Sequence, residues 1–225
     1  MLKRDRVGEK MKQVDIWNKR FQESNKVRND NQMWIEKYWQ FFEEEKDNEI
    51  LDLGCGRGQN ALYLCDKGLK VTACDFSPAA IDILKKIGKG INTYCLDMTE
   101  GLPFGNDNFG IVLASLSTHY FAESDTKILY SAIYDILKPD GYFIFKVNSY
   151  KEYLNKDISE LQCEIESNYY MLKDGTTKRY FTADSLASML EQFTIIQIEE
   201  DSSMYHGVTK YSIEGIVQKT YPQNI

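Results

Sequence analysis

The sequence predicts an α/β fold in which a doubly wound, mostly parallel sheet of seven strands has an antiparallel last strand and an N-terminal helical cap. Two observations support this prediction. Short apolar runs alternate with helical patterns from residue 49 onward. The connections between them are short, which is typical of repeated β-α-β units with parallel strands.

The length of 225 residues favours one domain, spanning residues 1–225. Residues 1–47 are polar, with aromatic side chains at helical spacing, and are expected to form the helical cap. Residues 49–149 hold the alternating strands and helices. Residues 150–225 are more varied and are expected to add an insertion and the final strands.

The first half of the chain predicts strands and helices in strict alternation. Five strands are expected, at residues 50–53, 69–75, 91–97, 109–116 and 142–147. Three helices are expected between them, at residues 57–67, 78–87 and 124–137. Ser77 is a typical N-cap before Pro78, and Gly68 and Gly88 are typical residues at helix C-termini. Residues 138–141, Lys-Pro-Asp-Gly, end the third helix.

The last part of the chain predicts antiparallel structure. Asp174-Gly175 is a hairpin signal between strands expected at residues 164–172 and 176–181. Thr182 is expected to cap a helix that ends at residue 191. Two final strands are expected as an antiparallel pair, at residues 193–200 and 211–219.

Composition narrows the function. The formal net charge of −7 disfavours phosphate backbones, and therefore nucleic acid, as a partner. The five cysteines form no Cys-x-x-Cys pair and no group with histidine, which indicates a reducing cytosol and no metal site. The charged N-terminus does not resemble a signal peptide, and no apolar run approaches membrane-spanning length. We therefore expect a cytoplasmic protein, as a monomer or homodimer.

A glycine turn follows the first strand. Asp52 precedes glycines at 54, 56 and 58, and a helical pattern follows them. Glycine lets the backbone adopt positive φ and lets a ligand lie directly on it, beside the free N–H groups of a helix start. A dinucleotide-binding fingerprint would place its third glycine where Gln59 stands. The spacing therefore favours a cationic amino-acid nucleoside and disfavours a nicotinamide-dependent oxidoreductase.

Further polar residues close the next strands of the predicted sheet. Asp75, Asp97 and Ser115 end or follow the second, third and fourth strands. Ligands of open α/β sheets bind beyond the carboxyl ends of the strands, near the point where strand order reverses. Each aspartate alone could instead cap backbone N–H groups. Their joint placement beside the glycine turn favours a ligand site.

Four runs carry a family resemblance: Ile-Leu-Asp-Leu-Gly-Cys-Gly-Arg-Gly at 50–58, Cys-Asp-Phe-Ser at 74–77, Leu-Asp-Met at 96–98 and Leu-Lys-Pro-Asp-Gly-Tyr at 137–142. Together they resemble the class I S-adenosylmethionine-dependent methyltransferases, over residues 49–149. The small single-domain members are most similar, including the tellurite-resistance type, whose glycine loop also continues as Gly-Arg-Gly. The resemblance implies that class's Rossmann-like fold and S-adenosyl-L-methionine as cofactor, with residues 49–149 as the cofactor-binding half.

The resemblance also implies residue roles around the glycine turn. Gly54 and Gly56, with Cys55 between them, would let the backbone approach the methionine part of the cofactor. Asp52 would orient the amino group of the cofactor. The backbone carbonyl of Ser115 would help to hold this amino group.

Other roles concern the nucleoside and the carboxylate. Asp75 would hold the ribose, and Phe76 would pack on the adenine. Asp97 would accept from the adenine amine, while the backbone N–H of Met98 meets the ring. Arg20, in the helical cap, would contact the cofactor carboxylate, although a solvated helix face is the alternative interpretation.

The sequence says less about the methyl acceptor than about the cofactor. His119 is the candidate general base, because it follows the fourth strand, where an acceptor would approach. Residues 115–120, Ser-Leu-Ser-Thr-His-Tyr, lack the Asn/Asp-Pro-Pro-aromatic turn of amino-directed base methyltransferases, and the chain has no Pro-Cys dipeptide. These absences favour a small-molecule acceptor, methylated by in-line displacement. Tyr120, Tyr169 and Tyr170 are candidates to line its pocket, with ordinary packing as the alternative.

Two other hypotheses remain open. The first is a methyltransferase that acts on RNA or protein. The second is a noncatalytic protein that binds S-adenosylmethionine or S-adenosylhomocysteine. Residues 149–181 depart from a minimal methyltransferase core and would help to shape the acceptor site or a dimer contact.

Overall fold

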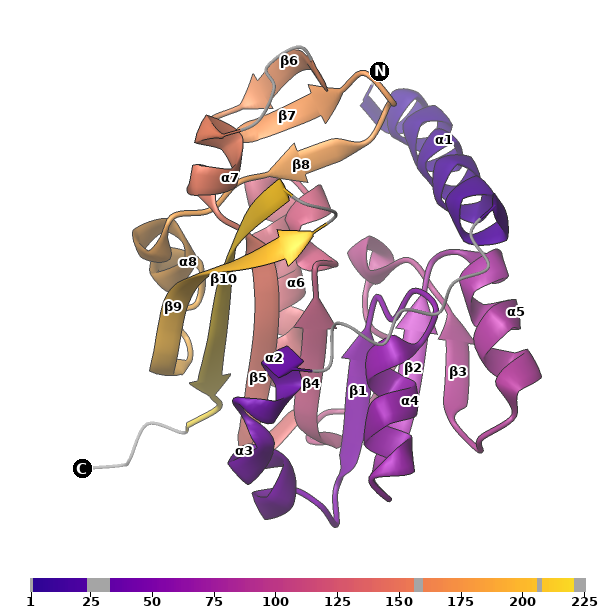
Figure 1. The fold of residues 1–225 in the computed structure, drawn as a ribbon, viewed down its shortest axis with the longest axis vertical. Coiled ribbons are helices and arrows are strands. Elements are labelled where there is room, and N and C mark those ends of the chain that lie inside the picture. The colour runs from indigo at the N-terminus through magenta and orange to yellow at the C-terminus, as the bar shows by residue number, and fades with distance from the viewer. Residues whose placement is uncertain (1, 24–32, 156–159, 206–207, 221–225) are drawn as a thin grey trace.

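A computed structural model describes residues 2–23, 33–155, 160–205 and 208–220, and shows a central sheet between two helical layers, with a smaller sheet at one end (Figure 1). Its helices and strands are, in order, α1 (Leu2–Glu23), α2 (Met33–Glu36), α3 (Trp39–Glu44), β1 (Glu49–Leu53), α4 (Gln59–Asp66), β2 (Lys70–Asp75), α5 (Pro78–Ile87), β3 (Asn92–Cys95), η1 (Met98–Glu100), β4 (Phe109–Ser115), η2 (Thr118–Tyr120), α6 (Glu123–Ile136), β5 (Leu137–Asn148), α7 (Tyr150–Leu154), β6 (Leu161–Glu166), β7 (Tyr169–Leu172), β8 (Thr177–Arg179), α8 (Ala183–Met189), β9 (Thr194–Tyr205) and β10 (Val208–Gln218).

The central sheet has seven strands in the order β3-β2-β1-β4-β5-β10-β9. The first five are parallel, and β10 runs antiparallel to both β5 and β9. The predicted doubly wound sheet with an antiparallel last strand is therefore confirmed. Strand order reverses between β1 and β4, which is where ligands of such sheets bind.

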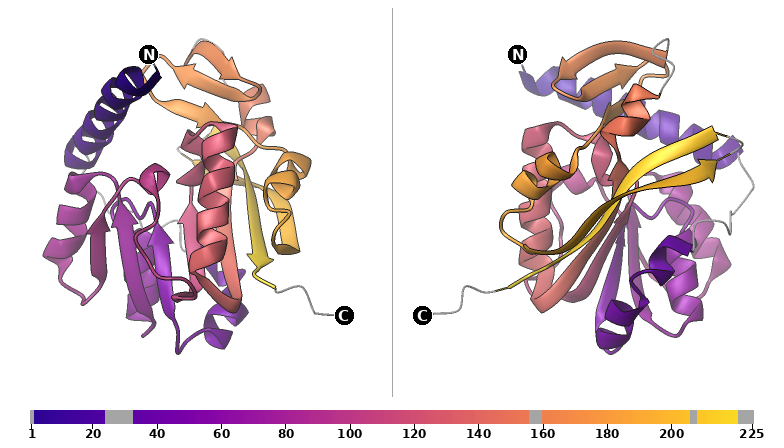
Figure 2. Two further views of the ribbon diagram at one scale, coloured as in Figure 1. Left: turned by 180° about the vertical axis from the view of Figure 1, so that it is seen from behind. Right: turned by 60° about the vertical axis from the view of Figure 1, so that its left-hand side comes forward.

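Two apolar clusters hold the layers together. One lies under α6 and α8 and includes Leu129, Ile133 and Leu186. The other lies under α2, α3, α4 and α5 and includes Phe42 and Leu64. The sheet thus has helices on both faces (Figure 2), which explains why β4 is buried along nearly its whole length.

The helix boundary signals act as predicted. The Ser77 hydroxyl accepts from the N–H of Ala80 and Pro78 opens α5, whereas Gly88 ends that helix at φ +70°. Thr182 caps α8 in a capping box with Ser185. These boundaries are local, because each depends on a hydrogen bond or a φ value within a few residues.

Two sequence predictions of strands were wrong. Residues 164–172 do not form one strand, because Asn168 takes φ +60° and splits the segment into β6 and β7. Asparagine tolerates this left-handed conformation better than most residues. Residues 138–141 do end α6, but β5 already begins at Leu137, which pairs with Phe109. A register shift in that pairing accommodates Asp140 at φ +64°.

The expected N-terminal cap contains three helices in its described part, α1, α2 and α3. The small sheet β6-β7-β8 lies at the end of the molecule where α1 lies (Figures 1 and 2). Among the described residues, no helix is both long enough and apolar enough to cross a membrane.

Candidate active site

The glycine turn begins with two N–H groups on one carbonyl. Gly54 and Cys55 both donate to the carbonyl oxygen of Cys74, at 2.8 Å each, so the turn is fastened to β2. Gly54 has φ +75°, and a Cβ added there would overlap Cβ of Ser117. Position 54 therefore requires glycine for both its conformation and its space.

The other two glycines of the turn have different surroundings. A Cβ on Gly56 would meet the ring of Phe21 at 3.4 Å, so α1 covers the turn at this point. A Cβ on Gly58 would lie 2.5 Å from Cδ1 of Leu84. Gly58 thus allows α4 to pack closely on α5.

Asp52 carries a buried oxygen atom without a partner. Its side chain is 1% exposed, and Oδ2 accepts from the N–H of Ala61 at 3.1 Å. Oδ1 has no hydrogen-bond partner among the described residues. Burial raises the pKa of Asp52 to about 7, and the charge of Asp75 adds to this rise. A cationic amino group at Oδ1 would satisfy the carboxylate, so this residue fits the ligand that the glycine turn suggests.

Asp75 supports the turn and also faces the site. Its Oδ2 accepts from the N–H of Gly56 and its Oδ1 from the N–H of Ser77, each at 2.9 Å. Burial raises the pKa of Asp75, and these two hydrogen bonds oppose the rise. The capping interpretation is therefore correct for this residue. Each carboxylate oxygen has a second lone-pair direction, so Asp75 can also accept from two ribose hydroxyls.

The remaining predicted cofactor residues lie along the same strand ends. Asp97 caps η1 through Thr99, whose N–H and hydroxyl lie 2.9 and 2.7 Å from Oδ1. Met98 is buried, and its Cε would lie 3.2 Å from a Cβ on Gly54. Phe76 is half-buried and directly follows β2.

A backbone feature that the sequence did not reveal follows Ser115, the last residue of β4. Leu116 adopts φ +53°, which is unfavourable for a residue with a branched side chain. Its N–H donates to the carbonyl of Lys146 at 2.7 Å, and the Ser117 hydroxyl donates to the carbonyl of Leu53 at 2.7 Å. Such strained residues gather at functional sites. This bend turns the chain from β4 into η2, which carries His119.

His119 is buried and neutral. It is 2% exposed, and Nδ1 has no hydrogen-bond partner within the described part of the chain. Burial and the charge of Lys178 hold the pKa of His119 well below its usual value. The ring packs on Tyr120 with centroids 4.2 Å apart. At neutral pH its unpaired nitrogen is available to a ligand.

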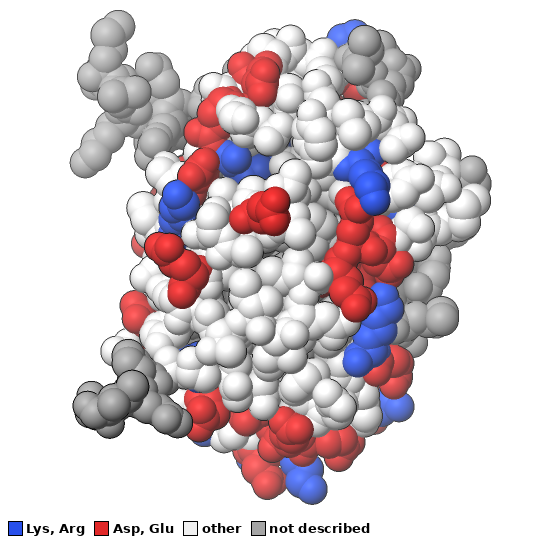
Figure 3. Space-filling view, turned by 90° about the vertical axis from the view of Figure 1, so that its left-hand side faces the viewer, with Lys and Arg blue, Asp and Glu red and all other residues white. Residues whose placement is uncertain are grey.

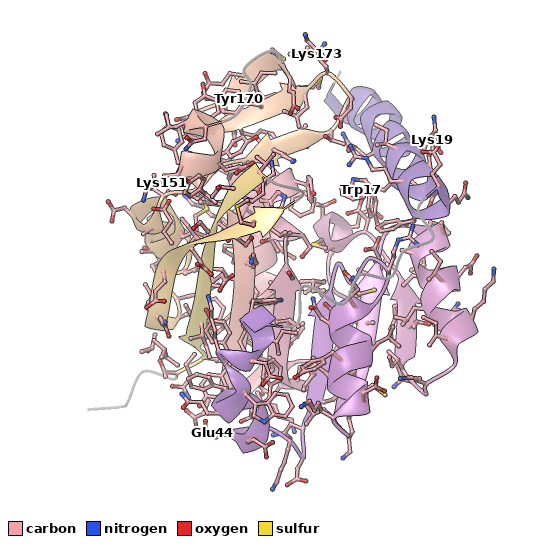
Figure 4. All side chains as sticks on the ribbon, in the orientation of Figure 1. Trp17, Lys19, Glu44, Lys151, Tyr170 and Lys173 are labelled. Carbon is pink, nitrogen blue, oxygen red and sulfur yellow. The ribbon has the colours of Figure 1, made fainter. Side chains whose placement is uncertain are left out.

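Helix α1 lies across the site and reaches both of its sides. Trp17 points from α1 toward the strand ends (Figure 4), and its ring meets Tyr120 edge-on with centroids 5.3 Å apart. Oδ1 of Asn18 accepts from the Ser77 hydroxyl at 2.5 Å and from the Ala79 N–H at 3.3 Å. Asn18 thus ties α1 to the start of α5, a role that the sequence did not indicate.

The other side of α1 contacts the turn between β7 and β8. Gln13 donates to the carbonyl of Gly175 at 2.6 Å, and Arg20 pairs with Asp174 at 2.5 Å. The guanidinium of Arg20 also lies 4.7 Å from the Trp17 ring centroid. The side chain of Arg20 therefore pairs with Asp174, a residue 154 positions further along the chain. The predicted contact of Arg20 with a cofactor carboxylate stays a prediction.

The predicted acceptor tyrosines divide into two positions. The Tyr169 hydroxyl donates to the carbonyl of Tyr120 at 3.0 Å and so fastens β7 to η2. Tyr170 instead stacks on Tyr153 of α7, with centroids 4.8 Å apart and ring planes 15° from parallel. Tyr169 therefore supports the site, whereas Tyr170 packs with Tyr153 and also with Tyr180, whose ring centroid lies 6.0 Å away.

Comparison with known proteins agrees with this geometry. Residues 50–141 match the family model described as a methyltransferase domain. An uncharacterized methyltransferase of Synechocystis, sll0829, is 36% identical over 42% of this chain and 44% of its own length. The tRNA N(3)-methylcytidine methyltransferase Mettl2 of Drosophila melanogaster is 26% identical over 72% of this chain and 57% of its own length. The chain spans about half the length of the curated relatives it matches.

Solved structures share the fold at low sequence identity. An S-adenosylmethionine-dependent methyltransferase from Clostridium acetobutylicum has a TM-score of 0.65 and 20% identity, over 92% of this chain and 97% of that one. The 1,6-didemethyltoxoflavin-N1-methyltransferase of Burkholderia thailandensis, solved with 1,6-didemethyltoxoflavin and S-adenosylhomocysteine bound, has a TM-score of 0.59 and 21% identity, over 77% and 71%. Residues 50–141 are thus similar to a methyltransferase domain, and the chain shares the fold of these solved structures.

Proposed function

We propose that this protein transfers a methyl group from S-adenosyl-L-methionine to a ring nitrogen of a small, planar heteroaromatic acceptor. The observation that carries the proposal is the neutral His119, with its unpaired nitrogen, at the strand end next to the glycine turn. The aromatic rings of Trp17 and Tyr120 lie beside it and suit a planar acceptor. The names of two relatives, for N(3)-cytidine and N1 methylation, support a ring nitrogen as the target.

On the cofactor side, residues of this chain would bind S-adenosyl-L-methionine and orient it. Asp52 would accept from the amino group and Asp75 from the ribose hydroxyls, while the backbone at Gly54 and Gly56 borders the methionine part. Phe76, Asp97 and Met98 would hold the adenine. Ser115, Cys55 and Arg20 would complete the set that the family resemblance suggests.

On the acceptor side, alignment and proton removal are needed. Bound S-adenosylmethionine supplies an activated methyl group, whose carbon–sulfur bond breaks as the carbon–nitrogen bond of the product forms. The proton that the ring nitrogen loses would pass to Nδ1 of His119, which is neutral before the reaction. Helix α1 covers the glycine turn through Phe21 and would help to exclude water. The displacement itself requires no metal ion.

A small acceptor is supported by charge. Helix α1 carries seven Lys or Arg and four Asp or Glu, a net +3, which leaves −10 for the rest of the chain, given the total of −7. On the side of β9 and α8, acidic side chains form larger patches than basic ones (Figure 3). An extended polyanion would meet this surface with repulsion.

An RNA base is the second candidate. Several relatives are named as tRNA methyltransferases, so the sequence-based expectation against nucleic acid gains no support from them. The basic α1 lies at the mouth of the site and could contact phosphates. This candidate predicts that methyl transfer falls steeply as salt is raised from 50 to 200 mM.

One experiment separates these functions. The protein is incubated with methyl-labelled S-adenosylmethionine and a cell extract divided into a metabolite fraction and an RNA fraction, and products are identified by mass spectrometry. Label in a metabolite with a new N-methyl group supports the proposal, whereas label in RNA supports the second candidate.

Calorimetry supplies the binding control. S-adenosylhomocysteine should bind saturably, and Asp75→Ala should abolish the binding. Saturable binding without label in either fraction would favour the noncatalytic hypothesis. No binding at all would refute the assignment of the cofactor.

A further inference from the structure

Three buried side-chain polar atoms without partners belong to residues in or near η2, the end of β5 and the segment after β8. They are Nδ1 of His119, Nδ2 of Asn148 and the hydroxyl of Tyr180, and none has a hydrogen-bond partner among the described residues. His119 and Tyr180 are each 2% exposed. Buried polar groups in folded proteins are nearly always paired, because an unpaired one loses its hydration without replacement. A group of three therefore calls for a ligand.

The backbone brings these residues together. The N–H of Phe181 donates to the carbonyl of Asn148 at 2.9 Å, which places Tyr180 beside the end of β5. Ser115 pairs with Lys146, so η2 and His119 follow β4 directly next to that same end. Thr177 fastens β8 to η2, because its hydroxyl donates to the carbonyl of Tyr120 at 2.8 Å.

The side chain of Asn148 points to the same face of the sheet as the side chain of Asp52. Successive side chains of a strand point to opposite faces. Ile50 of β1 and Ile144 of β5 belong to the same apolar cluster. Asp52 and Asn148 lie two and four positions beyond them, so both point to that same face. The unpaired amide of Asn148 and the unpaired carboxylate oxygen of Asp52 are thus on one side of the strand ends.

We propose that Asn148 and Tyr180 determine acceptor specificity by recognising the edge of a lactam-type heteroaromatic ring. Nδ2 of Asn148 donates to the ring carbonyl oxygen. Nδ1 of His119 accepts from the adjacent ring N–H, which is the nitrogen that is methylated, and the Tyr180 hydroxyl bonds to a second polar atom of the ring. This assignment rests on the proposed function, and it narrows the acceptor to rings with a carbonyl beside an N–H.

The first test measures stability without any ligand. Tyr180→Phe and Asn148→Leu remove polar atoms that have no partner in the free protein. The melting temperature should therefore stay unchanged or rise by up to about 4 °C. A fall of more than about 4 °C in both variants would show that these groups have structural partners, and it would overturn the proposal.

The second test measures methyl transfer to the metabolite fraction. Each variant should lose roughly 5- to 150-fold in kcat/KM, mainly through a higher KM, because the acceptor loses one hydrogen bond in a buried site. Affinity for S-adenosylhomocysteine should stay within about twofold of wild type. Unchanged transfer in both variants would refute the recognition roles of Asn148 and Tyr180.

Tyr63→Phe is the matched control. Tyr63 also has a buried hydroxyl without a partner among the described residues. It belongs to α4, however, and its ring packs on Trp39 of α3, away from the acceptor side. This variant should keep full transfer, and an equal loss in it would overturn the proposal. Saturable cofactor binding without any transfer by the wild-type protein would instead refute the proposed function, and the two failures are thus distinguishable.

Discussion

The cofactor half and the acceptor side of this protein differ in how their polar groups are held. Around the glycine turn, Gly54, Cys55 and Asp75 make hydrogen bonds to residues at most 20 positions away in the chain. On the acceptor side, η2 is held by contacts from β7 and β8, more than forty residues further along the chain. Nδ1 of His119, Nδ2 of Asn148 and the Tyr180 hydroxyl have no hydrogen-bond partner there among the described residues. A local motif thus fixes the shared chemistry, whereas long-range packing shapes the part that varies among such enzymes.

The largest effect is expected from a substitution in the cofactor-binding half. Gly54→Ala should abolish binding of S-adenosylhomocysteine and lower the free energy of unfolding by more than about 2 kcal/mol, because Cβ would overlap Ser117 at φ +75°. Calorimetry and urea denaturation measure the two effects. Gly90→Ala is the control, since Gly90 has φ +76° and open space around it. It should cost only the backbone strain, about 1 kcal/mol, and equal losses in both variants would contradict the role of the overlap.

A second substitution removes contacts that hold the acceptor side together. The buried Arg179 donates through Nε to the carbonyl of Phe121 at 3.1 Å, contacts Glu166, and lies over the Tyr169 ring at 5.1 Å. Arg179→Ala should destabilise the protein by about 2 kcal/mol and reduce methyl transfer. Its affinity for S-adenosylhomocysteine should be unchanged. The exposed Lys173→Ala is the control, and lost cofactor affinity in Arg179→Ala would show that the two regions are not separable.

The raised pKa of Asp52 should make both the stability of the protein and its cofactor binding depend on pH. Its folded pKa of about 7 lies above the unfolded value of about 3.9, so the stability that its protonated form contributes is lost as pH rises from 4 to 7. Asp52→Asn should remove this part of the pH dependence. Binding of a cationic amino group requires the carboxylate, so S-adenosylhomocysteine binding near pH 6 should release a proton. Calorimetry in buffers of different ionisation enthalpy measures this release, and an unchanged signal in Asp52→Asn would contradict the assignment.

His119 should change the pH dependence of stability in the opposite direction from Asp52, and by less. Burial lowers its folded pKa, so the unfolded chain binds the proton more readily and stability is lost as pH falls below about 6.5. His119→Asn should weaken this loss and should reduce methyl transfer while cofactor affinity stays intact. Denaturation curves between pH 5 and 8 measure the difference. A pH profile identical to that of the wild-type protein would mean that His119 is not held neutral by burial.

The sequence predicted most of the cofactor half because its signals are local. Ser77, Pro78 and Gly88 define α5 through caps and φ preferences, and the structure confirms each. The split of residues 164–172 into β6 and β7 was missed, because a single asparagine at positive φ gives little signal in an alternating pattern. Asn148 and Tyr180 were also missed, since burial without a partner depends on what surrounds a residue.

The sequence by itself determined the alternation of strands and helices, the glycine turn and the acidic residues at the strand ends, since short-range sterics and hydrogen bonds set them. Only the tertiary structure decided that Phe21 covers Gly56 and that one oxygen of Asp52 has no partner among the described residues. It also decided that Phe181 pairs with Asn148, which places Tyr180 beside the end of β5. The physical reason is that desolvation depends on all the elements packed around an atom, and these come from distant parts of the chain.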